Sequence, residues 1–392
     1  MVAQRLSSTE ILGAVRDFAP RIAEAGPRIE AERRIPPEII QGLVEIGVFK
    51  VLVPRSMGGS EIPLPLYGEI MEAIARADGS TAWCASQGAV AALVSGFLPG
   101  AEEIFTDPHV IIASGAGTPG VAIEEDGGYR VTGRWPFGSG SRHATWLAGG
   151  CVMKRADGST IPRENGAPQT CTAYFRASDA EFEDIWKVSG LRGTGSDLYA
   201  VTDYLVPRER VALMPYDRPL QSGPLYRFPA VGFTPVHAIG FASVALGLAG
   251  AMHDAFVELA ATKVPRGVTG ILRDNAVVQS RVAESEAMLR SCRMYLRQTV
   301  EAAWNATLAE GSVPHEHRVA IRLATTFSIL QAMKVADATF HAAGATAIFT
   351  SQPFERRFRD IHAVSQQVQG RAEHLETVGQ ALFGLEHDQQ WL

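Results

Sequence analysis

The spacing of the apolar residues changes twice along the 392-residue chain, and this order of patterns limits the fold more than any single motif does. Through roughly the first hundred residues, apolar side chains recur at helical spacing. Between about His109 and Pro215 they alternate with polar residues, as in strands, and after about Pro235 the helical spacing returns. We therefore predict an α+β protein that is mainly α, with a helical domain at 1–108, a central β domain at 109–220 and a helical bundle at 221–392.

Local signals place several element boundaries. The run Ser7–Glu10 has the pattern of a capping box at the start of a helix, and Pro36-Pro37 precedes a second amphipathic stretch. After a break at 78–79, Ser80 can cap a further helix. In the central part, Asp126-Gly127 separates two alternating runs, which is typical of a hairpin turn.

Two apolar stripes at helical spacing mark the C-terminal part. They consist of Val278, Val282, Leu289, Cys292, Leu296 and Val300, and of Val319, Leu323, Phe327 and Leu330. Long amphipathic helices of this kind are typical of a helical bundle, whose apolar faces need partners.

Composition excludes several classes of protein. The net charge is −6, with no long basic run, so we predict no binding of nucleic acid. The four cysteines form no CxxC pair, which argues against a metal site and fits a reducing, cytoplasmic location. The N-terminus has no apolar segment of signal-peptide type, and no window of eighteen apolar residues is uninterrupted, so we predict no membrane span.

Two familiar motifs lack the neighbouring sequence that their usual functions require. The run 115–120 matches GxGxxG, but an alternating strand follows it where a dinucleotide site requires a helix. Its glycines more simply allow the backbone to approach something flat or to turn. Ser139 and His143 lack the GxSxG elbow of a hydrolase nucleophile, and we expect His143 to anchor a loop.

Seven segments, in order, carry a more specific signal. They are SMGGSEIPL (56–64), ARADGSTAW (75–83), WPFGSGSRHATW (135–146), GLRGTGSDLYAVTDYLVP (190–207), RDNAVVQSRVAE (273–284), AAGATAIF (342–349) and FERRFRDIHAV (354–364). Over nearly its whole length the chain resembles the acyl-CoA dehydrogenase superfamily. Within it, RRIPPEIIQGLVEIGVF, GLRGTGS and RFRDIHA are most similar to the two-component flavin-dependent monooxygenases.

The resemblance implies an N-terminal helical domain, a central β-barrel-like domain and a C-terminal four-helix bundle, assembled as a homotetramer. It also implies FAD or FMN, delivered reduced by a separate flavin reductase, and O₂. The substrate would be a small aromatic or polycyclic molecule.

The resemblance also implies cofactor-binding residues. They are Ser114, Gly115, Trp135, Phe137, Ser139, Gly140, Thr194, Ser196, Arg273, Gln279, Arg356 and Arg359. Trp135 and Phe137 would shield or stack on the flavin ring, with Ser139 near its N5 edge; the alternative is that the aromatic residues only fill the barrel core. Arginine suits phosphate, although Arg356 could equally belong to a solvated helix face.

The chain departs from the family where bases are expected. The segment Ser365–His374 has no glutamate before Glu373, so the carboxylate base of the dehydrogenases is missing. Gln367, Ala91 and Val94 occupy places where the monooxygenases carry histidine.

We name Ser139, His362 and Gln367 as catalytic candidates. Two alternatives stay open: a dehydrogenase of acyl-CoA type, and a catalytically silent flavin-binding protein.

Overall fold

The computed structural model describes residues 6–228 and 233–392; positions 1–5 of the predicted N-terminal domain and 229–232 of the predicted bundle lie outside this range. The N-terminal helices are α1 (Ser8–Glu32), α2 (Pro37–Ile46), α3 (Leu64–Ala77), α4 (Gly79–Leu93) and α5 (Ala101–Phe105). The strands are β1 (Ile112–Ser114), β2 (Gly120–Glu125), β3 (Gly128–Gly138), β4 (Trp146–Lys154), β5 (Thr170–Arg176), β6 (Glu181–Glu183), β7 (Asp197–Pro207) and β8 (Val211–Met214). The C-terminal helices are α6 (Thr234–Ala260), α7 (Ala276–Glu310), α8 (His315–Ala343), α9 (Glu355–Ser365) and α10 (His374–Leu382).

Two helix starts show how well local signals work. The capping box is present at α1, where the Ser7 hydroxyl accepts from the Glu10 N–H and the Glu10 carboxylate accepts from the Ser7 N–H. At α4 the prediction was wrong by two residues. Asp78, not Ser80, is the N-cap, and its carboxylate accepts from the backbone N–H of Thr81.

The strands form one mixed sheet in the order β6-β7-β3-β2-β4-β5-β8, with β1 parallel to β4. The predicted hairpin joins β2 to β3 through a turn at Gly127, whose φ of 80° suits glycine. Between β3 and β7 the register shifts twice, and beyond the first shift Leu205 points to solvent although Tyr199 and Val201 point inward.

The sheet curves around a core of its own. Trp135 on β3 lies 5.5 Å from Phe175 on β5, between ring centroids, although β2 and β4 separate these strands in the sheet. The Trp135 indole is fully buried and donates from Nε1 to the carbonyl of Gly150 at 2.9 Å. Contact across two intervening strands requires a strongly bent sheet, as the predicted barrel-like domain implies.

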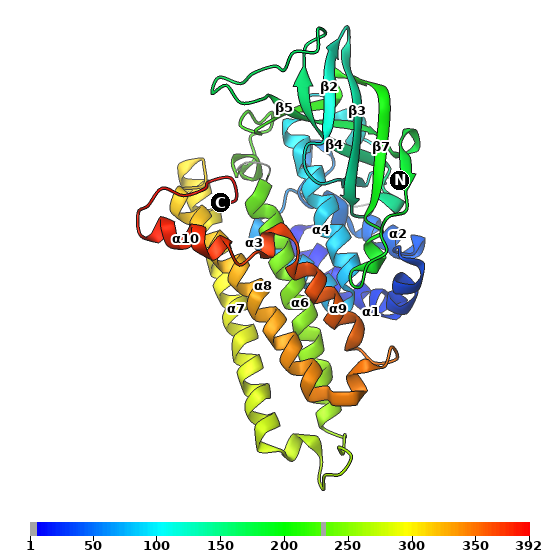
Figure 1. Cartoon of the computed structure of the whole chain (residues 1–392), viewed down its shortest axis with the longest axis vertical. Helices are drawn as coiled ribbons and strands as arrows, with labels where there is room; N and C mark the ends of the chain where they lie inside the picture. Colours follow the sequence, from blue (N-terminus) through cyan, green and yellow to red (C-terminus); the bar gives the residue numbers. More distant parts are fainter. Residues whose placement is uncertain (1–5, 229–232) are drawn as a thin grey trace.

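The long helices α6, α7 and α8 pack with α9 as a bundle, and α10 lies against α8 (Figure 1). On α7 the predicted stripe is buried except for the half-buried Val282. On α8 the predicted stripe is only partly confirmed. Val319 is buried, Leu323 and Leu330 are half-buried, and Phe327 is 39% exposed. The buried face of α8 instead combines larger apolar side chains such as Ile321 and Ile329 with small ones such as Ala324.

N-terminal and C-terminal helices share one core. The rings of Trp83 on α4 and Phe241 on α6 stack at 4.1 Å, with 7° between their planes. In Figure 1 the sheet lies at one end of the molecule and the bundle extends away from it. The predicted domain boundaries stay a prediction, since the last N-terminal helix ends at Phe105 and the last strand at Met214.

Two segments among the described residues are long and apolar enough to cross a membrane: Thr234–Ala260 and His315–Ile348. In the first, 89% of the apolar window is buried inside the protein, and in the second 61%. Buried core helices pass the same test of length and composition, so this is weak evidence for a membrane protein.

The positions of Trp135 and Phe137 predict opposite responses to truncation. Trp135→Ala leaves a large cavity inside the sheet and should lower the free energy of unfolding by about 3–5 kcal/mol. Phe137 is 57% exposed, and Phe137→Ala should change it by less than about 1 kcal/mol. Denaturant unfolding of the two variants, which sit two residues apart, measures the difference. Equal losses would contradict the core role of Trp135.

Candidate functional site

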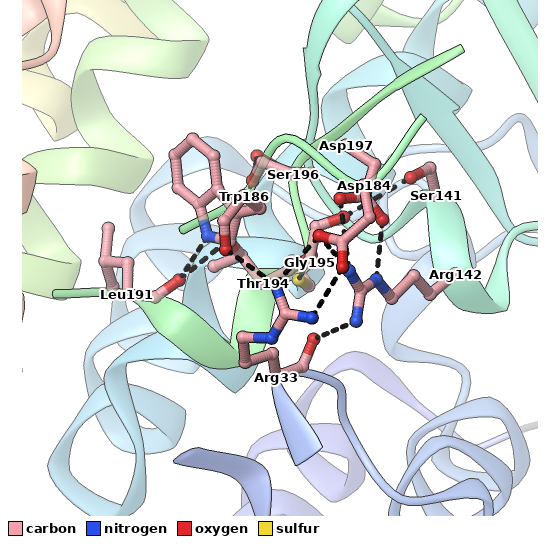
Figure 2. A network of polar contacts seen from close by, with 12 residues as sticks. Arg33, Ser141, Arg142, Asp184, Trp186, Leu191, Thr194, Gly195, Ser196 and Asp197 are labelled. Carbon is pink, nitrogen blue, oxygen red and sulfur yellow. Dashed lines mark hydrogen bonds and ion pairs between the residues drawn. The ribbon is translucent and has the colours of Figure 1, made fainter. Parts of the chain in front are cut away.

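A network of charged and polar groups holds the segment 190–197 against the sheet (Figure 2). The guanidinium of Arg142 binds the buried carboxylate of Asp197 through two nitrogens, at 2.6 and 3.1 Å. It also contacts Asp184 at 3.2 Å and donates to the carbonyl of Arg33, at the end of α1. Paired charge-assisted bonds fix geometry as well as energy, so this network sets the position of the GLRGTGS segment.

Hydroxyl groups of this segment and of Ser139 form a buried chain of hydrogen bonds. The Trp83 Nε1–H donates to the Ser139 Oγ at 3.1 Å, which lies 2.8 Å from the Ser196 Oγ. The Ser196 Oγ lies 2.7 Å from the Thr194 Oγ1, which donates to the carbonyl of Leu191 at 2.8 Å.

The hydrogen bonds between these hydroxyl groups all run in one direction. Each hydroxyl has a single hydrogen. That of Thr194 goes to the Leu191 carbonyl, so Ser196 must donate to Thr194 and Ser139 must donate to Ser196. Ser139 is thus left with one free lone pair and no free hydrogen. Toward any bound molecule it can accept a hydrogen bond but not donate one.

The sequence motif around Ser139 is divided between core and surface. Phe137 adopts a φ of 60°, lies 57% exposed and meets the edge of Trp186, with ring centroids 6.0 Å apart. Gly140, at a φ of 79°, donates its N–H to the Thr194 carbonyl at 2.9 Å. Trp135 has no exposed surface, so its ring belongs to the barrel core, the alternative considered above, and cannot stack on a cofactor.

A cavity of about 240 Å³ lies between the sheet, α4 and α6. Its lining consists of Val90, Ala91, Val94, Ser114, Gly115, Gly117, Thr118, Ala148, Gly150, Thr172, Tyr174, Met214, Tyr216, Phe233 and His237. Of the predicted cofactor residues, Ser114 and Gly115 face it. Two glycines of the GxGxxG run act by their small size, because a Cβ on Gly115 would fall 2.4 Å from the Cβ of Trp135 and one on Gly120 would fall 2.6 Å from the Trp135 ring.

His237 on α6 is a site residue that sequence reasoning missed. Its ring lies 5.8 Å from that of Phe241, which in turn stacks on Trp83. The Nδ1 atom is buried and has no partner among the described residues, and burial lowers the pKa of the ring to about 4. In the sequence it stands in an apolar helix, and no motif marks it.

The three catalytic candidates do not meet in one place. His362 pairs through Nε2 with Asp337 on α8 at 3.0 Å. The Gln367 Oε1 accepts from the backbone N–H of Gln369 and so caps a short 3₁₀ turn at Val368–Gly370. Neither side chain lines the cavity, and Ser139 lies in the hydroxyl chain.

Arg356 and Arg359 are engaged with neighbouring carboxylates. Arg359 pairs with Glu30 and with Glu355, both at 2.8 Å. Arg356 lies 4.0 Å from Asp78. The neighbouring Asp360 serves the backbone instead, since its Oδ1 accepts from the N–H of Leu191 at 2.6 Å.

Arg273 and Gln279 lie together at the start of α7. Arg273 precedes α7 and its side chain is 60% exposed, and the Gln279 Nε2 donates to the Arg273 carbonyl at 3.0 Å. In Figure 1 the turn before α7 lies at the bottom of the bundle, at the opposite end from the sheet. Among the described residues, no group of three or more histidine, cysteine or acidic side chains could hold a metal ion.

Comparison with known proteins gives consistent matches. Residues 7–97 match the acyl-CoA dehydrogenase N-terminal domain and residues 239–369 match the acyl-CoA dehydrogenase C-terminal domain. Indole-3-acetate monooxygenase of Pseudomonas putida is 31% identical over 379 residues, which cover 95% of this chain and 92% of that protein. The oxygenase component of the FADH(2)-dependent resorcinol hydroxylase of Rhizobium sp. is 28% identical, over 99% of this chain and 98% of its own.

Solved structures agree over the whole length. The HsaA monooxygenase of M. tuberculosis superposes with a TM-score of 0.88 at 27% identity, over 99% of this chain and 100% of that one. XiaF of Streptomyces sp., in complex with FADH2 and glycerol, has a TM-score of 0.88 at 25% identity, over 97% of this chain and 96% of its own.

The buried contact between Asp360 and the 190–197 segment should make stability depend on pH. Burial and the nearby Asp78 raise the pKa of Asp360 to about 7. Because the pKa is higher in the folded than in the unfolded chain, protonation of Asp360 stabilises the fold. This stabilisation is complete below about pH 4 and is lost as pH rises through about 7. Asp360→Asn should remove this decline, on the order of 1–4 kcal/mol.

Unfolding free energies measured from pH 4 to 8 test this, with the exposed Asp17→Asn on α1 as the control. A slope that Asp360→Asn leaves as steep as in the parent chain would refute the assignment.

Proposed function

The chain belongs to the acyl-CoA dehydrogenase superfamily, and from this premise we propose that it is the oxygenase component of a two-component flavin-dependent monooxygenase that hydroxylates a small aromatic molecule. Relatives over the full length are oxygenase components acting with reduced flavin. The lining of the cavity favours hydroxylation over dehydrogenation, because no carboxylate occurs among its described residues. Oxidation of an acyl thioester needs such a base, so the dehydrogenase alternative has no support at this site.

Reduced flavin, when bound, supplies the electrons that activate O₂, and the protein contributes binding, orientation and exclusion of water. The residues around Ser139 fit a flat ring with a polar edge. Phe137 offers an exposed aromatic surface. Gly140 has no side chain, so the backbone can come close to the ring, and Ser114 and Gly115 line the cavity. A separate reductase delivers the reduced flavin, as in the two-component relatives.

The one-way hydroxyl chain suits the reduced cofactor in particular. Ser139 can only accept, because its hydrogen is committed to Ser196. Reduced flavin carries a hydrogen on N5, whereas the oxidised form has a bare acceptor there. An acceptor held at N5 would therefore favour the reduced form, and we assign this role to Ser139.

The assembly we propose is a homotetramer in which Arg273 and Gln279 complete the site of a neighbouring subunit. Within one chain these two residues lie at the start of α7, and this end of the bundle points away from the sheet (Figure 1). The bundle also exposes large apolar side chains that a neighbour would cover, namely Met294, Tyr295 and Phe327. Exposed apolar surface of this kind is typical of interfaces.

The function is tested by mixing the anaerobic complex with reduced flavin against oxygenated buffer that contains a phenol or an indole. We expect a hydroxylated product, one per reduced flavin consumed. Bleaching of bound oxidised flavin by an acyl-CoA would instead support the dehydrogenase. A folded protein that takes up neither form of flavin would be neither enzyme.

Ser139→Ala should separate the two oxidation states of the flavin. Loss of one hydrogen bond predicts about three- to tenfold weaker binding of reduced flavin, with little change for oxidised flavin. Anaerobic fluorescence titration measures both affinities, and the exposed Ser178→Ala serves as the control. Equal weakening of both forms would remove the acceptor role from Ser139.

Mixed oligomers test the shared site. Arg273→Ala and Ser139→Ala should each weaken binding of reduced flavin when present in every subunit. If the site spans two subunits, an oligomer that carries both variants in different chains forms some sites with neither substitution. We expect the mixture to regain part of the tight binding in titration, and native mass spectrometry to show four chains. A monomer, or a mixture no better than its parents, would contradict the proposal.

A further inference from the structure

Among the polar side chains that line the cavity, those of Thr172, Tyr174 and Tyr216 are engaged by the protein itself. The Tyr174 hydroxyl donates to the carbonyl of Ala91 at 3.2 Å, and the Tyr216 hydroxyl lies 2.6 Å from the Thr172 Oγ1. Burial raises the pKa of both tyrosines well above their usual range. Among the described lining residues, His237 is the remaining group with a side chain that titrates below the tyrosines.

The ring of His237 has a defined position but no hydrogen-bond partner among residues 6–228 and 233–392. Its Nδ1 is buried and unpaired, and the residue as a whole is partly accessible at the cavity. The neighbouring ring of Phe241 limits rotation of the imidazole. Nε2 is therefore the nitrogen that a molecule in the cavity can reach.

The cost of burying an unpaired group decides which nitrogen of the neutral ring carries the hydrogen. A neutral imidazole carries one N–H and one bare nitrogen. A buried N–H without an acceptor is rarer in proteins than a buried acceptor without a donor. The unpaired Nδ1 should therefore be the bare nitrogen, which puts the hydrogen on Nε2, facing the cavity. Because burial holds the pKa of the ring at about 4, the ring stays neutral at physiological pH.

We propose that His237 determines substrate specificity by donating its Nε2–H to an oxygen on the aromatic substrate, so that the enzyme takes phenols in preference to rings of the same shape without oxygen. The inference rests on the proposed function, since it names the substrate class of the same site. The cavity of about 240 Å³ is smaller than most ligand pockets, which span about 300–1,000 Å³, and suits one or two rings.

The test compares phenol with toluene, which has a methyl group in place of the hydroxyl. Dissociation constants are measured by calorimetry on the full chain loaded with reduced flavin under anaerobic conditions. In His237→Leu, the preference for phenol over toluene should fall about three- to tenfold, the size expected for one lost hydrogen bond. His237→Gln keeps an N–H donor and should restore part of the preference.

A matched control lies on the same helix. His253 on α6 is also buried, but it faces Glu286 and does not line the cavity. His253→Leu makes the same chemical change and should leave the preference for phenol unaltered. A ¹⁵N NMR spectrum of labelled protein gives a second readout, because it distinguishes the Nε2–H from the Nδ1–H form and should show a perturbed Nε2 signal when phenol binds.

The outcomes separate this inference from the proposed function. If His237→Leu keeps the full preference, or if the ring carries its hydrogen on Nδ1, the inference fails while turnover with reduced flavin can still establish the oxygenase. If His237→Leu instead weakens flavin and leaves the preference unchanged, the residue serves the cofactor and the inference is also overturned. A protein that prefers phenol through His237 but never hydroxylates it would refute only the function.

Discussion

The contact between the Arg142 guanidinium and the Asp197 carboxylate is the interaction on which the candidate site depends. It joins the turn after β3 to the start of β7, and through the Arg33 carbonyl it reaches the end of α1. Removing one partner of a buried pair leaves an unpaired charge, which is strongly destabilising. The pair thus keeps sheet and N-terminal helices in one arrangement, and the 190–197 segment is positioned between them (Figure 2).

From that anchored segment, one continuous line of contacts leads to the cavity. The hydroxyl chain from Leu191 to Ser139 fixes the direction of every hydrogen, and it ends on the indole of Trp83. Trp83 stacks on Phe241, and Phe241 supports His237 at the cavity. Packed rings therefore connect the hydroxyl chain with the cavity wall. This continuity links the residue that we assign to flavin with the residue that we assign to substrate.

Sequence reasoning succeeded where the signal is local or where many segments agree. The capping box at Ser7–Glu10 is confirmed because it involves neighbours in the chain. The family and its fold are confirmed because seven motifs in order specify them together. It failed at Ser80, where the competing Asp78 caps α4, and at Phe327 on α8, which lies at the surface although helical spacing placed it on the apolar stripe.

The order of helices and strands, the family and the flavin could be predicted from the sequence alone, since these follow from spacing and from motifs along the chain. The sequence could not decide that Trp135 points into the barrel and Phe137 points out, because residues two apart in a regular strand share a face. The irregularity between Trp135 and Gly138, with Phe137 at a φ of 60°, turns the second ring outward. Nor could the sequence find His237, which is one histidine in an apolar helix until the fold brings the cavity to it. Burial and the presence or absence of a partner are properties of packing, and packing brings together residues that are far apart in the chain.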